Sequence, residues 1–325
     1  MTKEKREMLI FLIFTLAVLV LPLFLQGSYF LNVLVFIGIN TLLALGLNML
    51  MGYAGQISLG HAAFYGLGAY TTGILTVHFQ WSPWLALAAA IVLTAAVAYL
   101  IALPLLTLSG YYLGMGTLGF GMIAFVAFRQ WSGFTGGDSG LVGIPGLSIG
   151  PLSLDSPRNY LLLVWTVTLL AIFLCERLIN SRIGRALRAI HDSERAASSM
   201  GIDTGRLKVR IFILSALLAA IAGFLYAHLV SFISPGSFDF LVSIRMVTMA
   251  VIGGMASIWG ALLGAAVLTV LPETLTVFTE YEMIVYGLVM IVIMILLPQG
   301  LFRGVLDIYE SAKHKAGHLS AGPRN

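Results

Sequence analysis

The stretch Gly52–Thr71, GYAGQISLGHAAFYGLGAYT, combines many glycines and several polar side chains with residues apolar enough for a lipid bilayer. Glycine weakens a helix, and non-helical backbone at membrane depth is tolerated only where protein or water contacts it. The stretch therefore predicts a helix interruption inside a membrane bundle. The surrounding sequence must then supply the membrane-spanning helices.

Composition supports a membrane protein. Of the 325 residues, 59% are hydrophobic and 10% are charged, whereas about 25% of the residues of a typical soluble domain are charged. Continuous apolar runs of about 20 residues match the hydrocarbon thickness of a bilayer when they form helices. A transmembrane β-barrel would instead show alternating segments of about ten residues. The predicted fold class is all-α, a polytopic bundle of transmembrane helices.

The apolar stretches expected to cross or enter the membrane are Met8–Gln26, Leu31–Met51, Ile57–Val77, Trp84–Leu106, Tyr111–Phe128, Tyr160–Leu178, Val209–Val230, Val242–Leu271 and Tyr281–Leu297. The first is too long for a signal peptide and no small-residue cleavage site follows it, so we expect a retained span. Glycines interrupt Val242–Leu271, which predicts a re-entrant hairpin. The count is about 8 spans plus this interrupted hairpin, within a range of roughly 8–10 spans.

Charge placement predicts the orientation of the bundle. Lys and Arg are enriched at the cytoplasmic ends of membrane spans, and basic residues here precede the first apolar stretch, follow the last and cluster around one loop. That cluster comprises Arg177, Arg182, Arg185, Arg188, Arg195, Arg206, Lys208 and Arg210. We expect cytoplasmic N- and C-termini, a transmembrane domain over residues 1–310 with a cytoplasmic loop at residues 180–206, and a disordered cytoplasmic tail at residues 311–325.

Several functions are disfavoured by what the sequence lacks. A single cysteine, Cys175, rules out an internal disulfide and a cysteine-based metal site, and no metal site is predicted. The dipeptide Gly-Lys is absent, so the chain has no phosphate-binding loop of an ATPase. No strongly apolar span carries Asp or Glu near its centre, where ion-coupled carriers commonly place them. These absences favour an energy source outside this chain, and a passive channel is the alternative that they do not exclude. No nucleic-acid partner is expected.

Polar side chains within the apolar stretches are the candidates for a translocation path, because such side chains normally face the bundle interior or a water-filled cavity. These candidates are Asn48, Gln56, Ser58, His61 and Ser257. A purely structural role, in place of lining a path, is the alternative for each of these residues. Small residues at four-residue spacing let another helix approach closely, and a lone histidine such as His61 is more often hydrogen-bonded in a core than a proton carrier.

The interruption has a counterpart in the second half of the chain. Gly55 and Ser58 are separated by the same interval as Gly254 and Ser257, and a further glycine follows in each case, at Gly60 and at Gly260. Paired, glycine-interrupted segments in two halves of a transporter can indicate an internal repeat and its pathway.

The basic loop has its own helical pattern, RIGRALRAIHDSERAASSMGIDTGRLKVR. Its apolar residues at positions 183, 187 and 190 share one helical face. Asp192 or Ser193 can cap a second short helix that begins near Glu194, and Gly201 can end it in a left-handed turn. The loop is either an ordinary basic segment at the lipid surface or a helix–turn–helix plug that fits a groove on a partner protein.

Several stretches together resemble one family, the permease subunits of branched-chain amino-acid ABC importers of the LivM type. These stretches are GLNMLMGYAGQISLGHAAFYGLGAY, FTGGDSGLVGIPG, GRALRAIHDSERAASSMGI, ISPGSFDFLVSIRMVTMAVIGGMASIWGALLGA and LLPQGLFRG. They occur in the family's order, and the resemblance runs from about Leu31 to Gly304.

The resemblance implies a multi-pass permease of the bacterial inner (plasma) membrane, with no catalysis and no cofactor of its own. In the family, a second related permease forms a heterodimer with this subunit, and two cytoplasmic ABC ATPases bind ATP and Mg. An extracytoplasmic binding protein delivers leucine, isoleucine or valine. The lipid bilayer is the remaining partner.

The resemblance also implies that the basic loop is the ATPase-coupling element, whose general pattern is Glu-Ala-Ala, three residues, Gly, nine residues, Ile. The candidate coupling residues are Gly184, Glu194, Ala196, Ala197 and Gly201. The pattern departs from the family in that Glu194 is one place early and no Leu-Pro follows Ile211. Met122, in TLGFGMI, stands where relatives often carry Glu, so no function of that carboxylate is transferred.

Other functions remain open at this point. Permeases of related ABC importers carry urea, short amides or other amino acids. The sequence of the membrane spans does not identify which molecule is transported. A channel or secondary carrier acting alone would move solute without ATP, and a scaffold would move none.

Overall fold

The computed structural model describes residues 27–149, 152–154, 156–275, 287–288, 291–292, 295 and 300–301. The helices are α2 Ser28–Asn48, α3 His61–Val77, α4 Pro83–Leu105, α5 Tyr111–Gln130, α6 Ser132–Thr135, α7 Pro157–Asn180, α8 Arg182–Asp192, α9 Glu194–Ser199, α10 Thr204–Val230, α11 Phe240–Gly253 and α12 Ile258–Leu275. The π-helix η1 Met49–Tyr53 and the 3-10 helices η2 Gly137–Ser139 and η3 Pro235–Phe238 complete the helical segments. The short strands are β1 Leu141–Val142, β2 Ser148–Ile149, β3 Leu152–Ser153 and β4 Phe232–Ile233. The predicted span Met8–Gln26, the predicted tail 311–325 and most of Tyr281–Leu297 lie outside the described residues.

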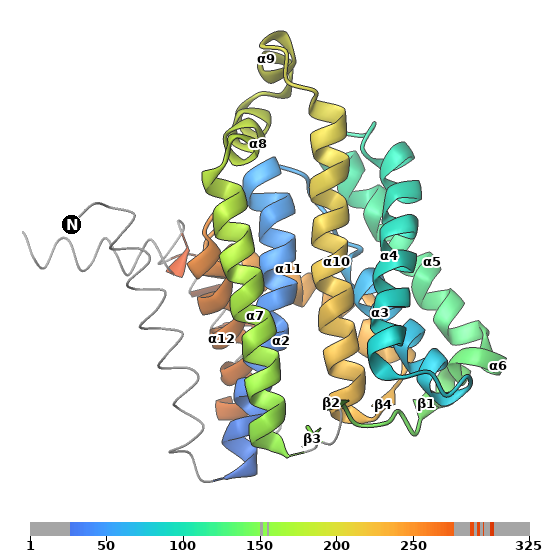
Figure 1. The fold of residues 1–325 in the computed structure, drawn as a ribbon. Coiled ribbons are helices and arrows are strands. Elements are labelled where there is room, and N and C mark those ends of the chain that lie inside the picture. Colours follow the sequence, from blue (N-terminus) through green and yellow to red (C-terminus); the bar gives the residue numbers. More distant parts are fainter. Residues whose placement is uncertain are drawn as a thin grey trace, which may run out of the picture.

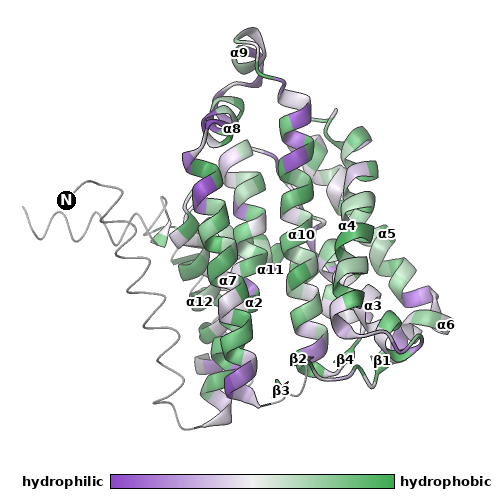
Figure 2. Cartoon of the chain, viewed as in Figure 1, coloured by the Kyte–Doolittle hydropathy of each residue, from purple (hydrophilic) through white to green (hydrophobic). Residues whose placement is uncertain are grey.

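The described part of the chain is an all-α bundle of a polytopic membrane protein. Its segments that are long and apolar enough to cross a membrane are Ser28–Tyr53, Pro83–Leu105, Tyr111–Gln130, Pro157–Asn180, Thr204–Val230 and Pro235–Gly253. Figure 2 shows these helices as mainly hydrophobic along their length. Two of them begin with a Ser-Pro pair: Ser82 and Ser156 accept hydrogen bonds from backbone N–H groups three residues later, which satisfies part of each free helix end.

The long helices lie side by side, with α8 and α9 beyond one end of α7 and α10 and the strands at the opposite end (Figure 1). Helix α10 is central, because it contacts α2, α3 and α4. Glycines allow its close approach to α3. A Cβ on Gly68 would overlap the backbone of Ala220, and a Cβ on Gly223 would overlap the backbone of Tyr65. These contacts are the small-residue packing typical of membrane helices.

Helix α3 begins four residues later than the predicted span Ile57–Val77. The backbone of Gly60 lies against the carbonyl of Thr117 on α5, with no room for a Cβ, and Leu59 donates its N–H to the Thr117 hydroxyl at 3.0 Å. Residues 57–60 are therefore held in a non-helical conformation by a neighbouring helix. Hydropathy alone cannot predict such a contact, so the predicted span begins too early.

Helices α11 and α12 form a tight antiparallel hairpin, interrupted where the glycines predict. Gly253, Gly260 and Gly264 approach backbone atoms of the facing helix too closely for a Cβ. Helix α12 then runs back along α2, where Thr269 accepts a hydrogen bond from the Asn40 amide at 2.9 Å. At the far end of α12, the Tyr29 hydroxyl lies 2.6 Å from a carboxylate oxygen of Glu273. The hairpin thus enters and leaves at the strand end of the bundle.

At the strand end, the α5–α7 connection is joined to the α10–α11 connection. Strand β1 pairs with β4 in antiparallel register, Leu141 opposite Ile233 and Val142 opposite Phe232. His228, near the end of α10, donates from Nδ1 to the carbonyl of Pro145 at 2.7 Å. These bonds fix the strand end of α10 to a loop that is distant in sequence.

Candidate functional site

The first helix break follows α2 directly. The π-helix η1 replaces the last turn of the helix, and Gly55 then takes a left-handed conformation with φ of +67°. The backbone N–H of Gln56 bonds to the carbonyl of Leu50 at 3.1 Å, and the Gln56 amide donates to the carbonyl of Ala54 at 3.0 Å. π-Helical turns are frequent at functional sites. This break is therefore a defined structure and not a loose loop.

His61 opens α3 immediately after this break and is fully buried. Its Nε2 lies 2.6 Å from the hydroxyl of Ser215 on α10, and its Nδ1 lies 3.1 Å from the hydroxyl of Ser58. Ser215 gives its single hydrogen to the carbonyl of Gly46 at 2.5 Å. Nε2 must therefore donate to Ser215, and Nδ1 accepts from Ser58. Both ring nitrogens of a neutral imidazole are satisfied, and the ring ties α2, α3 and α10 together.

Asn48 joins the first break to the second, which comprises residues 254–257 between α11 and α12. Its amide nitrogen donates to the carbonyls of Ser257 at 2.7 Å and Gly254 at 3.3 Å. Its amide oxygen accepts from the N–H of Ala256 at 2.8 Å. A Cβ on Gly52 would overlap both the Asn48 side chain and the Ala256 backbone. The two breaks, which the sequence pairs by spacing, are thus in direct contact.

Four of the five predicted path residues form two hydrogen-bonded pairs around the breaks. Asn48 meets Ser257, whose hydroxyl also caps α12 by accepting from the N–H of Gly260 at 3.0 Å. Ser58 meets His61, and Gln56 bonds within its own segment. Their role in a translocation path stays a prediction.

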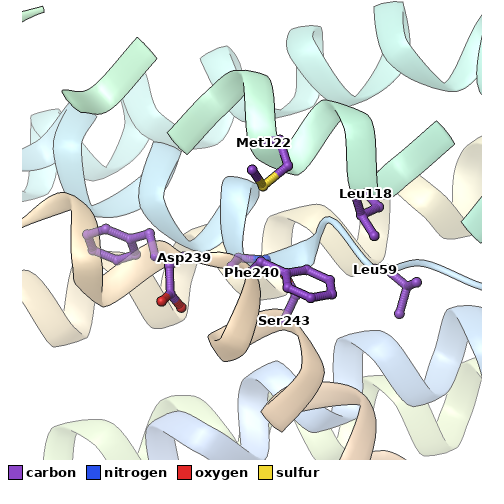
Figure 3. Close-up of a pocket in the computed structure, with 9 residues that line it drawn as sticks. Leu59, Leu118, Met122, Asp239, Phe240 and Ser243 are labelled. Carbon is purple, nitrogen blue, oxygen red and sulfur yellow. The ribbon is translucent and has the colours of Figure 1, made fainter. Parts of the chain in front are cut away.

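A shallow hollow lies beside the first break, between α3, α5 and the start of α11 (Figure 3). It is lined by Leu59, Ala62, Leu118, Gly121, Met122, Phe238, Asp239, Phe240 and Ser243. The lining is mainly apolar. Its carboxylate, Asp239, caps α11 by accepting from the N–H of Val242 at 3.0 Å.

The basic loop folds as two helices that are joined at a single residue. Ser193 caps α9 by accepting from the N–H of Ala196 at 3.3 Å. Gly201 has φ of +80°, its N–H bonds to the carbonyl of Ser198 at 3.0 Å, and the next N–H bonds to the carbonyl of Ala197 at 3.2 Å. This pattern is a Schellman motif. The predicted second helix and its glycine end are confirmed, and of the two predicted cap residues, Asp192 and Ser193, the structure uses Ser193.

Helix α8 packs its apolar face inward and turns sharply away from α7. Leu187 and Ile190 are buried, whereas Ile183 on the same face is 42% exposed. A Cβ on Gly184 would overlap the backbone of Ile179 in the preceding helix. Gly184 is therefore required by the α7–α8 corner itself.

The loop also contacts the first break. A Cβ on Gly55 would lie 3.2 Å from Cδ2 of His191 on α8, and the Arg188 guanidinium lies 5.9 Å from the centre of the Tyr53 ring. A continuous set of contacts thus runs from α8 through the first break and Asn48 to the second break.

Of the coupling candidates in α9, Ala197 is buried, whereas Ala196 is exposed to solvent. Glu194 is held by an ion pair: its Oε1 lies 2.6 Å from Nζ of Lys208 on α10. Sequence reasoning counted Lys208 among the loop cations and did not single it out. Its position four and seven residues before the buried Phe212 and Ser215 places it on the inward face of α10, which is the signal that was available.

An apolar helical bundle with two interlocked breaks and an amphipathic basic loop at one end defines a multi-pass helical membrane protein. Residues 29–294 match the family described as "Branched-chain amino acid transport system / permease component". The chain belongs to this family of transport permeases.

Relatives of the chain include permease proteins of branched-chain amino acid transport systems. The chain is similar to the high-affinity branched-chain amino acid transport system permease protein LivM of Salmonella typhimurium (strain LT2) and of Escherichia coli (strain K12), each 33% identical over 261 residues. The matched part is 73% of this chain and 61% of each LivM, so the chain spans less than two thirds of their length. LivH of Salmonella typhimurium is 32% identical over 170 residues, 49% of this chain and 55% of LivH. No solved structure matches the chain significantly.

Proposed function

We propose that the chain is the transmembrane permease subunit of an ATP-binding-cassette importer for branched-chain amino acids. The observation that carries this proposal is the α8–α9 loop, which lies beyond the bundle and keeps the spacing of Ala196, Ala197 and Gly201 in a capped, exposed helix. Membership of the permease family and the names of the LivM and LivH relatives support the same conclusion.

In this mechanism the permease is a gate that separate ATPases operate. Two cytoplasmic ATPases bind ATP and Mg, close on each other and move the α8–α9 loops. The tight corner at Gly184 carries that movement into α7, and the short connection after Gly201 carries it into α10. The two helix breaks supply places where neighbouring helices can shift without unfolding. This chain then provides the route and performs no chemical step of its own.

The proposed assembly has four kinds of component. A second related permease pairs with this chain, two ATPases bind the loop side, and an extracytoplasmic binding protein delivers Leu, Ile or Val at the strand end. The proposed location is the bacterial inner membrane, with both termini and the α8–α9 loop in the cytoplasm and 8–10 spans, roughly the number that the predicted stretches allow. The polar residues around the two breaks are the proposed lining of the path.

The test is ATP-dependent uptake by the whole assembly. The chain is purified with its partners, reconstituted in vesicles and supplied with binding protein, and uptake of labelled leucine is compared with uptake of labelled urea. We expect leucine uptake that requires ATP hydrolysis. Uptake of urea alone would indicate a related importer, uptake without ATP would indicate a channel or carrier, and no flux would indicate a scaffold.

A further inference from the structure

Three segments meet on the ammonium group of Lys208. The side chain is 7% exposed, and its Nζ lies 2.6 Å from Oε1 of Glu194, the first residue of α9. The same Nζ donates to the carbonyl of Leu106 at 3.3 Å. Leu106 is the residue that follows α4 and closes its last turn. One cation on α10 therefore connects the short helix of the loop with the end of a membrane helix.

Each of these contacts has a physical reason. A buried ammonium must be paired, because its desolvation is costly. The last carbonyls of a helix lack partners within the helix and carry partial negative charge, so the end of α4 is a favourable place for a cation. The geometry places Lys208 where both requirements are met together.

The connection matters because α9 has few others. Within α9, Ala197 is the one buried residue, so apolar packing holds this helix weakly. The Glu194–Lys208 ion pair is a directional contact, and through Leu106 it reaches α4, which packs along α10 and α3. Continuity of the chain carries movement of α9 into α10, and packing along α10 carries it into α4; the ion pair adds a direct link from α9 to the end of α4.

We infer that Lys208 is a positioning residue that makes α9, the start of α10 and the end of α4 move as one unit. The inference rests on the proposed importer function and deepens it. It assigns the direct link between α9 and the end of α4 to a single buried cation, outside the alanine and glycine residues of the loop pattern.

The first test measures leucine uptake per ATP hydrolysed in the reconstituted whole complex. We expect Lys208→Met to lower this ratio about tenfold, which lies within the usual range of coupling between distant sites. Lys208→Arg, which keeps the charge, is expected to restore most of the ratio. The matched control is Arg210→Met, which removes a cation from an exposed position on the same helix and is expected to leave the ratio unchanged.

The second test measures movement directly. Spin labels are placed at Ser198 on α9 and at Ser109 beyond the end of α4, both of which are exposed. In the otherwise unchanged complex we expect the distance between the labels to stay constant when ATP binds, because the two ends move together. In Lys208→Met we expect the distance to change with nucleotide.

The variant Glu194→Gln removes the half-exposed partner and tests the same contact if Lys208→Met fails to assemble. A normal ratio of uptake to hydrolysis in Glu194→Gln, or a label distance that changes with ATP while Lys208 is present, would overturn the inference. Absence of ATP-dependent uptake in the complex with the natural sequence would instead refute the proposed function, an outcome that differs from uptake that stays normally coupled in Glu194→Gln.

Discussion

At the scale of single residues, Asn48 has the most consequential side chain. Its three hydrogen bonds join segments that are more than 200 positions apart, all of them to backbone groups of the second break. Backbone groups buried in a membrane protein have no water to replace a lost partner. The Asn48 amide therefore supplies hydrogen-bond partners that the backbone of the second break does not find within its own segment.

Replacing this amide is expected to destabilise the bundle. Asn48→Ala leaves one buried and two partly buried backbone groups without this partner, and we expect a loss of about 3 kcal/mol. The control is Asn40→Ala on the same helix: its partner Thr269 also bonds to the carbonyl of Ala265, so the expected loss is about 1 kcal/mol. The readout is the temperature at which the thiol of Cys175, the single cysteine and 2% exposed, reacts with a maleimide dye. Equal shifts for both variants would contradict the role of Asn48.

The sequence could nominate these residues but not their partners. The sequence points to Asn48 and Ser257 because polar side chains at membrane depth are rare, and the Asn48 amide does bond to the Ser257 carbonyl. Their pairing depends on the packing of α2 against the hairpin, which no local pattern encodes. For the same reason Lys208 was counted as a loop cation, although its side chain is buried.

At the scale of elements, local rules predicted some boundaries and tertiary contacts set the others. The cap at Ser193, the glycine end at Gly201 and the break after Gly253 follow from residues within a few positions. The start of α3 at His61 depends instead on the contact between Gly60, just before α3, and Thr117 on α5. Apolar stretches thus locate the helices, whereas contacts with adjacent helices set the helix ends at the breaks.

The contact between α3 and α10 gives a paired test of glycine packing. Gly68→Ala forces a methyl group against the Ala220 backbone, and we expect a loss of about 1–3 kcal/mol. Gly119→Ala on α5 meets nothing within 4 Å, and we expect a gain of up to about 1 kcal/mol from helix propensity. Thermal exposure of Cys175 measures both. A drop of the same size for Gly119→Ala would show that the contact with α10 is not the cause.

Helix α9 gives a test of the coupling element itself. Gly201→Ala places a side chain at φ of +80°, which costs about 1–2 kcal/mol in the left-handed region, and Ala197→Leu enlarges the one buried residue of the helix. We expect the double variant to insert into the membrane normally but to lose leucine uptake and co-purification with the ATPases. Gly205→Ala, at an ordinary helical position in α10, is the control. Full uptake by the double variant would refute the coupling role.

At the scale of the whole molecule, the placement of basic residues predicts the orientation in the membrane. The α8–α9 loop and the strands lie at opposite ends of the bundle (Figure 1), so one measurement on each end decides which faces the cytoplasm. We expect Ser198→Cys, in a Cys175→Ala background, to react with a membrane-impermeant reagent only in inside-out vesicles. Ser132→Cys on α6 is expected to react only in right-side-out vesicles. Labelling of Ser198→Cys from outside the cell would place the loop on the wrong side for an ATPase.

The pairing of β1 with β4 has a mechanical consequence for the whole molecule. Because these strands and the His228–Pro145 bond anchor the strand end of α10, we expect α10 to pivot about that end. Its 27 residues span about 40 Å, so a tilt of only about 5° would swing its free end by about 3–4 Å. In the proposed importer, a small change in this angle would move the α8–α9 end of α10 by several ångströms and the strand end very little.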